Sequence, residues 1–593
     1  MRKLMSGNEA IAYGAYLSGV KVGSAYPGTP STEVMDNFSR YPGVYAEWAP
    51  NEKVALDVGI GAAYAGSRAM VAMKHVGLNV AADALFYSSY TGLNGGLIII
   101  NADDPGMHSS QNEQDNRVYA KFAKVPMLEP ADSEDAKTFV KVALELSETF
   151  DTPVILRTTT RISHSKSSVE LEDSAAPASE KSTSPAYNRD PGKFVMVPAN
   201  ARRRHPVVED RLAKLAAYAE TAEINRIEMG KEQLGIIAGG IAYQYAREVF
   251  PDASFLKLGM VYPLPQELIR SFAAKVKVLL VVEELEPFIE EHIRLMGIPV
   301  KGKGVFPITG EFSPHLVREC AAKAGLINME QDNSSTTVSQ PELPVRPPML
   351  CPGCGHRGVF HTLSKLDVLV LGDIGCYTLG AAPPLSAMHT CGCMGASIGV
   401  AHGVDKAGVS DRSVAIIGDS TFFHTGITPL INVLYNQGTT TTIVLDNRVT
   451  AMTGHQVNPG TGLTLQNKET REINISGLAK SIGYEMVDEV SPYDLDKLSS
   501  VIEKHINSSL PSLISVKHPC VLNVKEKHPA PVVDQDICVN CGTCLELGCS
   551  PLTQEEDHVS INPLLCNGCG LCVQVCPAEA ILVNDDNNGK ERR

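Results

Sequence analysis

Short runs of hydrophobic residues alternate with stretches of helical spacing along most of the chain. The clearest runs are aliphatic or β-branched and lie at residues 69–73, 97–101, 154–157, 368–371, 414–417, 442–445 and 513–516. Turn residues lie beside these runs, and the segment ITPLINVLYNQG between two of them has the periodicity of a helix. This pattern predicts buried parallel strands connected by helices in two large α/β regions. Residues 230–325, which lie between the two large regions, show the same alternation on a smaller scale.

Two polar stretches interrupt this alternation. Residues 165–205 are rich in Ser, Pro and Ala, and residues 328–343 are polar, with prolines in and just after them. Such compositions predict linkers or surface excursions. A chain of 593 residues also exceeds what one hydrophobic core supports. We therefore expect about four domains, over residues 1–190, 205–330, 345–525 and 529–588.

Two features of the middle region are interpreted as structural. Gly239 and Gly240 follow a predicted strand, where a packed strand-to-helix turn is a commoner arrangement than a phosphate site. Glu283 and Glu284 end the next predicted strand, and we expect them in a solvated turn.

The net charge and the lengths of the apolar runs argue against two classes of partner, nucleic acids and membranes. A hydrophobic content of 44% and a charged content of 20% are those of an ordinary globular protein, and the formal net charge of −15 disfavours nucleic-acid binding. No apolar run approaches the ~20 residues of a membrane span. The first residues also lack the apolar block of a signal peptide. We expect a soluble cytoplasmic protein whose cysteines are thiols or metal ligands.

Eight of the fifteen cysteines lie in the last sixty residues, in two runs. The second run reads C-x2-C-x2-C-x3-C-P, the spacing of a bacterial-type ferredoxin module with two [4Fe–4S] clusters, in which the fourth Cys of each run ligates the other cluster. The two predicted ligand sets are Cys538, Cys541, Cys544 and Cys576, and Cys566, Cys569, Cys572 and Cys549. One extra residue precedes Cys549, which makes it the least regular ligand. Zinc knuckles and disulfides are the alternatives.

Polar side chains follow two neighbouring predicted strands in the third domain. The run at 414–417 leads into Gly418-Asp419-Ser420, and the run at 442–445 leads into Asp446-Asn447. Open α/β sheets bind ligands at the carboxyl ends of their strands. Hard oxygen ligands near a diphosphate suit Mg²⁺. Many strands end in Asp without such a role, which is the alternative interpretation.

This layout resembles the thiamine diphosphate (TPP) motif, in which G-D-G is followed along the chain by N-N. Here Ser420 replaces the second Gly and Asp446 replaces the first Asn. The resemblance implies that Gly418, Asp419 and Ser420 contact the cofactor. It also implies that Asp419 and Asn447 bind Mg²⁺ through their side chains and Val449 through its carbonyl.

Two N-terminal segments add to this resemblance. The loop from Tyr26 to Thr32 looks like the Y-P-x-T-P-S loop of 2-oxoacid:ferredoxin oxidoreductases. In that family the Thr of the loop lies beside TPP and the substrate carboxyl, and Thr29 is its counterpart here. Glu52 lies in a segment similar to one in TPP enzymes. In those enzymes a Glu of this segment activates TPP through the aminopyrimidine ring of the cofactor. A solvated helix Glu is the alternative, and Glu47 is a nearby rival.

The order of domains resembles that of the alpha subunits of indolepyruvate-type 2-oxoacid:ferredoxin oxidoreductases. It implies an α/β fold with two TPP-binding-type parallel-sheet domains flanking a smaller transketolase-C-like domain, then the ferredoxin module. It also implies oxidative decarboxylation of indolepyruvate and other arylpyruvates to the aryl-acetyl-CoA, with ferredoxin as electron acceptor and a small beta subunit as partner, as α2β2 or similar. Another 2-oxoacid specificity (pyruvate or branched-chain), or an electron-transfer subunit with an inactive TPP fold, remains the alternative. The single tryptophan, Trp48, is a hypothetical wall of the substrate pocket.

Four further cysteines match positions in beta subunits of related enzymes. Cys351, Cys354, Cys376 and Cys520 lie in segments that resemble C-P-G-C-G-H, G-I-G-C and P-C, which hold a [4Fe–4S] cluster near TPP in those subunits. They are a candidate third cluster, with reduced thiols or a zinc site as the alternatives. His75 and His389 are candidate TPP contacts, although a lone His is more often structural.

Overall fold

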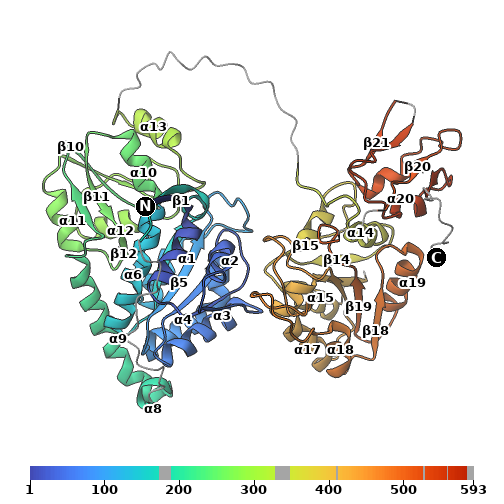
Figure 1. Cartoon of the computed structure of the whole chain (residues 1–593), viewed down its shortest axis with the longest axis horizontal. Coiled ribbons are helices and arrows are strands. Elements are labelled where there is room, and N and C mark those ends of the chain that lie inside the picture. Colours follow the sequence, from blue (N-terminus) through green and yellow to red (C-terminus); the bar gives the residue numbers. More distant parts are fainter. Residues whose placement is uncertain (173–188, 328–346, 409–411, 525–527, 557, 584–593) are drawn as a thin grey trace. The chain divides into compact units, whose positions relative to one another are not determined.

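The computed structural model describes residues 1–172, 189–327, 347–408, 412–524, 528–556 and 558–583. The chain forms two compact units, Met1–Ser339 and Gln340–Arg593 (Figure 1). Both units have the α/β organisation that the alternating pattern predicts. The predicted linker at 328–343 lies outside the described residues.

The first unit is built on a seven-stranded sheet with the order β12-β6-β7-β5-β4-β2-β3. Its strands are β2 (Val22–Ala25), β3 (Tyr45–Trp48), β4 (Ala69–Lys74), β5 (Leu97–Asp103), β6 (Met127–Leu128), β7 (Val154–Thr159) and β12 (Met260–Tyr262). All neighbours are parallel except β12 and β6. The three strands predicted in this region are confirmed, each one or two residues longer at its carboxyl end.

Helices connect these strands and pack on the sheet. They are α1 (Gly7–Leu17), α2 (Thr32–Phe38), α3 (Glu52–Tyr64), α4 (His75–Thr91), α5 (Arg117–Ala123), α6 (Ser133–Phe150) and α7 (Thr160–His164). All seven residues of β5 are buried, so this central strand has no solvent-exposed face. Parallel strands covered by crossover helices are buried in this way, which explains their nearly continuous hydrophobic runs.

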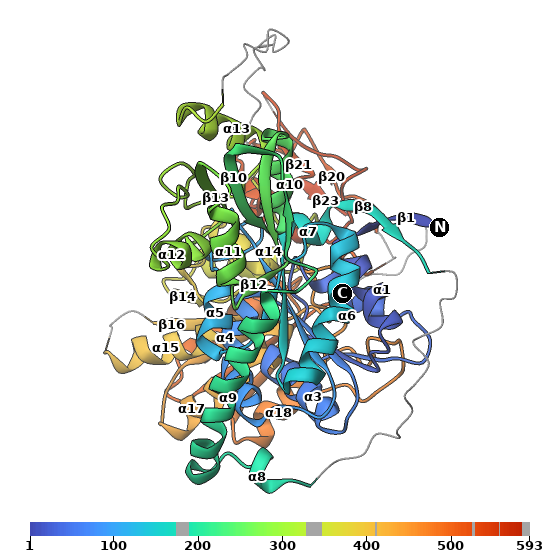
Figure 2. The same cartoon turned by 90° about the vertical axis from the view of Figure 1, so that its left-hand side faces the viewer.

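A smaller four-stranded sheet completes this unit, in the order β13-β10-β11-β9. Its strands are β9 (Arg226–Glu228), β10 (Lys231–Gly239), β11 (Ala253–Leu258) and β13 (Val278–Val282), with helices α10 (Gly240–Val249), α11 (Gln266–Ala273), α12 (Phe288–Leu295) and α13 (Pro314–Lys323). Between β11 and β13 the chain also forms β12, which joins the seven-stranded sheet and lies beside α5 (Figure 2).

Residues 165–205, predicted to be a linker or surface excursion, are mostly exposed where they are described, but most of these residues form regular elements and not a linker. Residues Lys166–Glu170 form β8, which pairs antiparallel with β1 (Arg2–Ser6). Pro191–Phe194 form α8, and Pro198–Ala219 form the long helix α9. Val169 is fully buried within an otherwise polar strand, so one apolar side chain and pairing with the N-terminus outweigh the polar composition. Residues 173–188 lie outside the described residues.

The expectation that Glu283 and Glu284 are solvated is also wrong, because both are buried. Glu283 Oε2 lies 2.6 Å from Arg117 Nη1, and Arg117 also pairs with Asp115. Glu284 accepts a hydrogen bond from the Phe312 amide at 2.8 Å, and burial raises its pKa to about 7. The cation that pairs with Glu283 comes from a distant segment of the chain, which explains why local sequence does not indicate its burial.

The turn at Gly239 and Gly240 is tightly packed. A Cβ built at Gly240, where φ is +54°, would lie 2.6 Å from Oε1 of Glu129. Glycine is therefore required for packing against Glu129, in agreement with the structural interpretation of this turn.

The second unit contains a six-stranded sheet with the order β15-β14-β16-β17-β19-β18, parallel throughout. Its strands are β14 (Leu369–Gly372), β15 (Thr390–Cys391), β16 (Ser413–Gly418), β17 (Thr441–Asp446), β18 (Met486–Val490) and β19 (Ser512–Lys517). Its helices are α14 (His356–Ser364), α15 (Ala396–Lys406), α16 (Asp419–Thr421), α17 (Ile427–Tyr435), α18 (Ile475–Ser481) and α19 (Leu495–Ile506), with the short η1 (Cys376–Ala381) and η2 (Phe422–Gly426). The four strands and the helix predicted here are confirmed.

The cysteine-rich end of this unit is small and has two short strand pairs. They are β20 (Val532–Val533) with β23 (Ile581–Leu582), and β21 (Leu552–Gln554) with β22 (Val559–Ile561). Two short helical segments, η3 (Thr543–Leu547) and α20 (Leu571–Gln574), carry cysteines of the two runs. No helix among the described residues is long and apolar enough to cross a membrane. The four-domain boundaries remain a prediction.

Candidate functional site

The carboxyl ends of four adjacent strands meet at one edge of the six-stranded sheet. Asp373 follows β14, Asp419 follows β16, and Asp446 and Lys517 end β17 and β19. Gly418 is in register with Leu445, so Asp419 and Asp446 are the next residues along two paired strands. Parallel pairing thereby assembles charged side chains from distant parts of the sequence.

Asp419 is the most deeply placed of the predicted magnesium ligands. Its Oδ1 accepts a hydrogen bond from the Ser420 amide at 2.8 Å, and its Oδ2 accepts one from Asn458 Nδ2 at 3.1 Å. Burial and then the neighbouring Asp446 carboxylate raise the pKa of Asp419 to about 7. Two carboxylates that crowd each other in a buried place suit a bound cation, because a cation favours their charged forms.

The segment after β17 contacts the turn after β16. Thr450 Oγ1 donates to Ser420 Oγ at 2.8 Å, and the Val449 amide donates to Asn447 Oδ1 at 3.2 Å. The structure therefore brings the Gly418–Ser420 turn beside the segment that carries Asn447 and Val449. At Gly418 a Cβ would lie 2.7 Å from Cε1 of Tyr377, so a side chain there would displace this ring.

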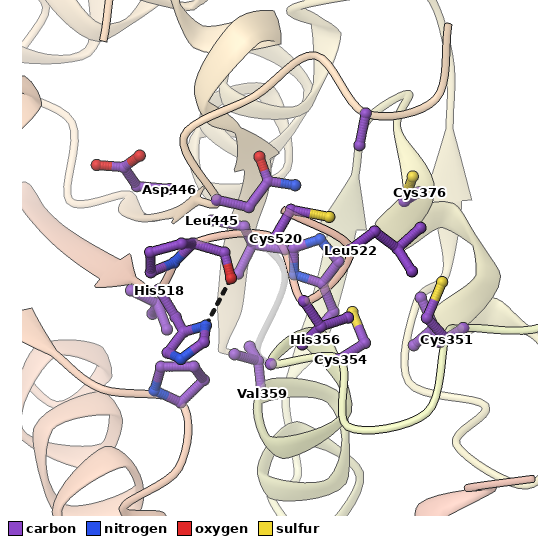
Figure 3. A pocket seen from close by; sticks show the side chains of 18 of the residues that line it. Cys351, Cys354, His356, Val359, Cys376, Leu445, Asp446, His518, Cys520 and Leu522 are labelled. Atoms are coloured by element: carbon purple, nitrogen blue, oxygen red, sulfur yellow. Dashed lines mark hydrogen bonds between the residues drawn. The ribbon is translucent and has the colours of Figure 1, made fainter. Parts of the chain in front are cut away.

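The four cysteines of the candidate third cluster line one cavity. Cys351, Cys354, Cys376 and Cys520 surround a space of ≈ 140 Å³ whose wall also includes Asp446 and Asn447. Their sulfur atoms lie around the same space in Figure 3. Burial and then the proximity of Cys520 and Cys351 raise the pKa of Cys376 to about 11. Residues up to 169 positions apart in sequence are thus neighbours here.

The eight C-terminal cysteines divide between two further cavities of ≈ 20 Å³ each. One is lined by Cys549, Cys566, Cys569 and Cys572, and the other by Cys538, Cys541, Cys544 and Cys576. This division is the one that the crossed ligand pattern predicts, and it includes the irregular Cys549. In the described part of the chain, no three His, Cys, Asp or Glu side chains converge closely enough to hold one metal ion.

In the first unit, the predicted cofactor contacts follow three adjacent strands of the seven-stranded sheet. The loop with Tyr26 and Thr29 follows β2, Glu52 follows β3, and His75 follows β4. Strand β2 is parallel to both β3 and β4, so these segments share one edge of the sheet. Tyr26 is buried, and the Thr29 carbonyl accepts a hydrogen bond from Ser109 Oγ at 3.4 Å.

Glu52 is the first residue of α3, and its position is fixed by local capping. The side chain of the preceding Asn51 accepts a hydrogen bond from the Val54 amide at 2.9 Å, which satisfies a free donor of the first turn. The Glu52 side chain is only 4% exposed. It lies against Gly77 of α4, where a Cβ would come within 2.7 Å of Glu52 Oε1. A solvated helix Glu is therefore not what the structure contains.

Lys74 is a residue of this edge that sequence reasoning missed. It ends β4, and its side chain lies beside Gly28. A Cβ built at Gly28 would lie 3.3 Å from Lys74 Cγ. Burial lowers the pKa of Lys74, while the carboxylates of Asp104 and Glu52 act in the opposite direction. A lysine at the end of a buried strand is the signal that could have found it.

The two candidate histidines have structural partners. His75 is fully buried, with Nε2 lying 3.1 Å from the Asn112 carbonyl. His389 is exposed, and its Nδ1 accepts a hydrogen bond from the Val370 amide at 2.9 Å. Their contact with a cofactor remains a prediction. Glu47, the rival of Glu52, accepts a hydrogen bond from Ser24 Oγ at 2.9 Å on the adjacent strand.

Three families match parts of the chain. "Pyruvate flavodoxin/ferredoxin oxidoreductase, thiamine diP-bdg" matches residues 13–230, and "Thiamine pyrophosphate enzyme, C-terminal TPP binding domain" matches residues 373–516. "4Fe-4S binding domain" matches residues 559–582, which contain the second cysteine run. The chain thus has TPP-binding-type domains and a C-terminal iron–sulfur domain, and the predicted fold class is confirmed.

Similar proteins cover nearly the whole chain. Indolepyruvate oxidoreductase subunit IorA of Archaeoglobus fulgidus is 40% identical over 97% of this chain and 96% of its own length. Subunit IorA of Thermococcus kodakarensis is 42% identical over 98% and 96%, respectively. A solved 2-oxoglutarate:ferredoxin oxidoreductase from Magnetococcus marinus with 2-oxoglutarate, coenzyme A and succinyl-CoA bound aligns with a TM-score of 0.45 and 19% identity, over 54% of this chain and 65% of that one. The chain belongs to the indolepyruvate oxidoreductase subunit IorA family of 2-oxoacid:ferredoxin oxidoreductases.

Proposed function

We propose that the chain is the TPP- and iron–sulfur-bearing alpha subunit of an enzyme that oxidatively decarboxylates indolepyruvate and other arylpyruvates. The products are the aryl-acetyl-CoA, CO₂ and reduced ferredoxin. One observation carries the proposal: the cavity lined by four cysteines is also lined by Asp446 and Asn447, at the strand edge that matches a TPP-binding domain. The proposed diphosphate and Mg²⁺ site and the proposed cluster site would therefore be neighbours within the second unit.

The residues of the strand edge fit a diphosphate held through Mg²⁺. Asp419 supplies a buried carboxylate, Asn447 an amide oxygen and Val449 a main-chain carbonyl, all oxygen donors that Mg²⁺ prefers. The turn formed by Gly418 and Ser420 is the contact proposed for the diphosphate. The nearby Asp446 carboxylate contributes to the raised pKa of Asp419, and this repulsion supports a cation here.

The first unit supplies the groups proposed to act on the other parts of the cofactor and on the substrate. Glu52 is the proposed carboxylate for the aminopyrimidine ring, with Gly77 leaving the room that its side chain occupies. Thr29, Tyr26 and His75 are proposed contacts from the neighbouring loops, and His389 is one from the second unit. Bound TPP supplies the electron sink for loss of CO₂, and the residues named here would bind and orient it.

The cysteines fit three electron carriers of one electron each. The two C-terminal sets are proposed to hold [4Fe–4S] clusters, and Cys351, Cys354, Cys376 and Cys520 are proposed to hold a third. These thiols must lose their protons when a cluster forms. The names of the relatives as a subunit support a partner chain, which we propose to be a small beta subunit that contributes to CoA binding. Location in the cytoplasm remains a prediction.

The proposal is tested with the chain co-produced anaerobically with its partner subunit. Ferredoxin reduction is measured with indolepyruvate, phenylpyruvate, 4-hydroxyphenylpyruvate, pyruvate and a branched-chain 2-oxoacid, with and without CoA. We expect arylpyruvates to be preferred, and loss of turnover in Glu52→Gln but not in Glu47→Gln. Preference for pyruvate or a branched-chain acid would overturn the substrate assignment. Full activity of Glu52→Gln would overturn the site, and inactivity with every 2-oxoacid would favour an electron-transfer subunit.

A further inference from the structure

The segment Cys351–Cys354 separates two of the cysteine cavities. Cys351 and Cys354 line the cavity of the candidate third cluster, whereas Gly353 between them lines the cavity of Cys549, Cys566, Cys569 and Cys572. The main-chain amide of Gly353 hydrogen-bonds to Cys549. A Cβ at Gly353, where φ is +68°, would lie 1.9 Å from Asn567 Oδ1. The two cavities therefore share a wall made by one short loop, with no room for a side chain.

Tyr493 lies in the same wall. Its hydroxyl donates to the Gly353 carbonyl at 2.7 Å, and its ring meets that of His518 edge-on, with ring centroids 4.3 Å apart. Burial raises the pKa of Tyr493, and so do the nearby Cys569 of one cavity and Cys354 and Cys520 of the other. One neutral aromatic side chain thus contacts the surroundings of both cysteine sets.

Arg357, in the first turn of α14, is the charged side chain of this wall. It is 2% exposed and lines the cavity of Cys549. Its Nη1 donates to the carbonyl of Leu547 at 2.9 Å and to that of Gly548 at 2.5 Å. Its Nε donates to the Cys351 carbonyl at 3.1 Å, and its Nη2 to that of Leu350. All these acceptors are uncharged.

No carboxylate in the described part of the chain lies within ion-pair distance of Arg357. A buried guanidinium without an anionic partner is costly. A [4Fe–4S] cluster with four thiolate ligands is an anion, and reduction by one electron adds a further negative charge. The cavity beside Arg357 is therefore where the missing counter-charge would lie.

The second C-terminal cavity has no such cation. The residues that line it beside Cys538, Cys541, Cys544 and Cys576 are all uncharged: Val533, Val539, Gly542, Val559, Pro577, Ala578, Ala580 and Ile581. In a low dielectric, a nearby cation stabilises the reduced cluster more than the oxidised one, and hydrogen bonds to ligand sulfurs act in the same direction. The two clusters thus have different electrostatic surroundings.

We propose that Arg357 is a positioning and potential-setting residue for the cluster held by Cys549, Cys566, Cys569 and Cys572. Its charge gives this cluster a higher reduction potential than its C-terminal neighbour, and the wall shared at Gly353 makes the cluster the acceptor of the electron that leaves the Cys351 site. In that step the donor site loses one electron and the cluster gains one. This inference rests on the proposed function, because it uses the cluster assignment.

The test uses the full-length chain, purified without oxygen and with its iron content measured. Cluster reduction is followed by EPR during a potentiometric titration of the wild type, Arg357→Gln and Arg357→Lys. We expect Arg357→Gln to lower the reduced-to-oxidised ratio of one cluster at a fixed potential about tenfold, which corresponds to 59 mV for a one-electron couple. Arg357→Lys keeps the charge, so it should recover most of this ratio.

Lys365→Gln is the matched control. Lys365 is the residue after α14, and its exposed side chain contacts Glu546 of η3 at 2.5 Å, so it joins the same two parts of the chain as Arg357. Because this pair is exposed, its loss should leave both potentials unchanged. Equal shifts in Lys365→Gln and Arg357→Gln, or no shift in Arg357→Gln with full iron content, would overturn the inference.

Two further outcomes separate this inference from the proposed function. Iron below about eight atoms per wild-type chain would overturn the cluster assignment itself. If Arg357→Gln does not incorporate iron, the potentials of the two C-terminal clusters are compared in the wild type instead. Cys569→Ala shows which of the two signals belongs to the cluster beside Arg357, because that signal is lost, and we expect this cluster to have the higher potential. A lower potential for that cluster would overturn the role of Arg357 while leaving the proposed reaction intact.

Discussion

Gly77 and Glu52 occupy adjoining space on two helices: a Cβ on Gly77 would lie 2.7 Å from Cγ and Oε1 of Glu52. The glycine of α4 thereby determines where the carboxylate of α3 can lie. An approach this close forces one of the two residues to move when a methyl group is added. The position of the proposed catalytic carboxylate therefore depends on a residue that has no side chain.

We expect Gly77→Ala to reduce turnover with any accepted 2-oxoacid by at least about tenfold, since displacement of a positioned group by 1 Å is costly. The matched control is Gly61→Ala in α3, where a Cβ would meet nothing within 4 Å. Ala is preferred over Gly in a helix by about 0.5–1 kcal/mol, so the control should be active and slightly more stable. Steady-state kinetics and thermal unfolding measure the two effects, and equal activity of both variants would contradict this account of Glu52.

The raised pKa of Glu284 predicts that stability of the first unit depends on pH. The folded state holds a proton on Glu284 up to about pH 7, whereas the ordinary value is 4.5. Its contribution is therefore fully present below pH 4.5 and is lost as the pH rises through 7. Glu284→Gln should flatten the decline in the free energy of unfolding between pH 5 and 8 by on the order of 2 kcal/mol. Denaturant unfolding at several pH values measures it, with exposed Glu319→Gln as the control.

The buried ion pairs of Arg117 predict a large loss of stability on its removal. Arg117→Met leaves Glu283 buried without its arginine and leaves Asp115 with only Arg157, 3.8 Å away. Breaking a buried pair in this way costs about 3–5 kcal/mol. Lys53→Met breaks the exposed pair with Asp57 and should cost less than about 1 kcal/mol. Denaturant titrations compare the two, and similar losses would show that the Arg117 network does not stabilise the fold.

The crossed arrangement of cysteines predicts which substitutions remove iron. Cys549→Ala should remove about four iron atoms per chain from anaerobically purified protein, because it deletes a ligand of one cluster. Cys320→Ala serves as the control, since Cys320 lies in α13 of the first unit and lines none of the three cysteine cavities. Iron analysis and visible absorption measure both variants. Undiminished iron in Cys549→Ala would exclude this irregular cysteine as a ligand.

Local patterns predict much of the fold, because buried parallel strands leave continuous hydrophobic runs. All seven strands predicted from such runs are present, and the edge residues Asp419 and Asn447 follow them as expected. The misses arise where long-range contacts decide. Val169 is buried by pairing with the N-terminal strand, and Glu283 by an arginine 166 residues away. Arg357 and Tyr493 give no local signal at all, since their roles depend on carbonyls and rings that only the folded chain brings near.

Strand β12 has a consequence for how this protein can be divided. The region that forms the small sheet also supplies the last strand of the large one, hydrogen-bonded to the two-residue β6. Excision of that region would uncover the backbone donors and acceptors of β6 and invite pairing with other chains. Fragments cut between the two sheets should aggregate. A chimera that exchanges the small sheet between homologues must keep Met260–Tyr262 from the same homologue as the seven-stranded sheet, because this strand completes that sheet.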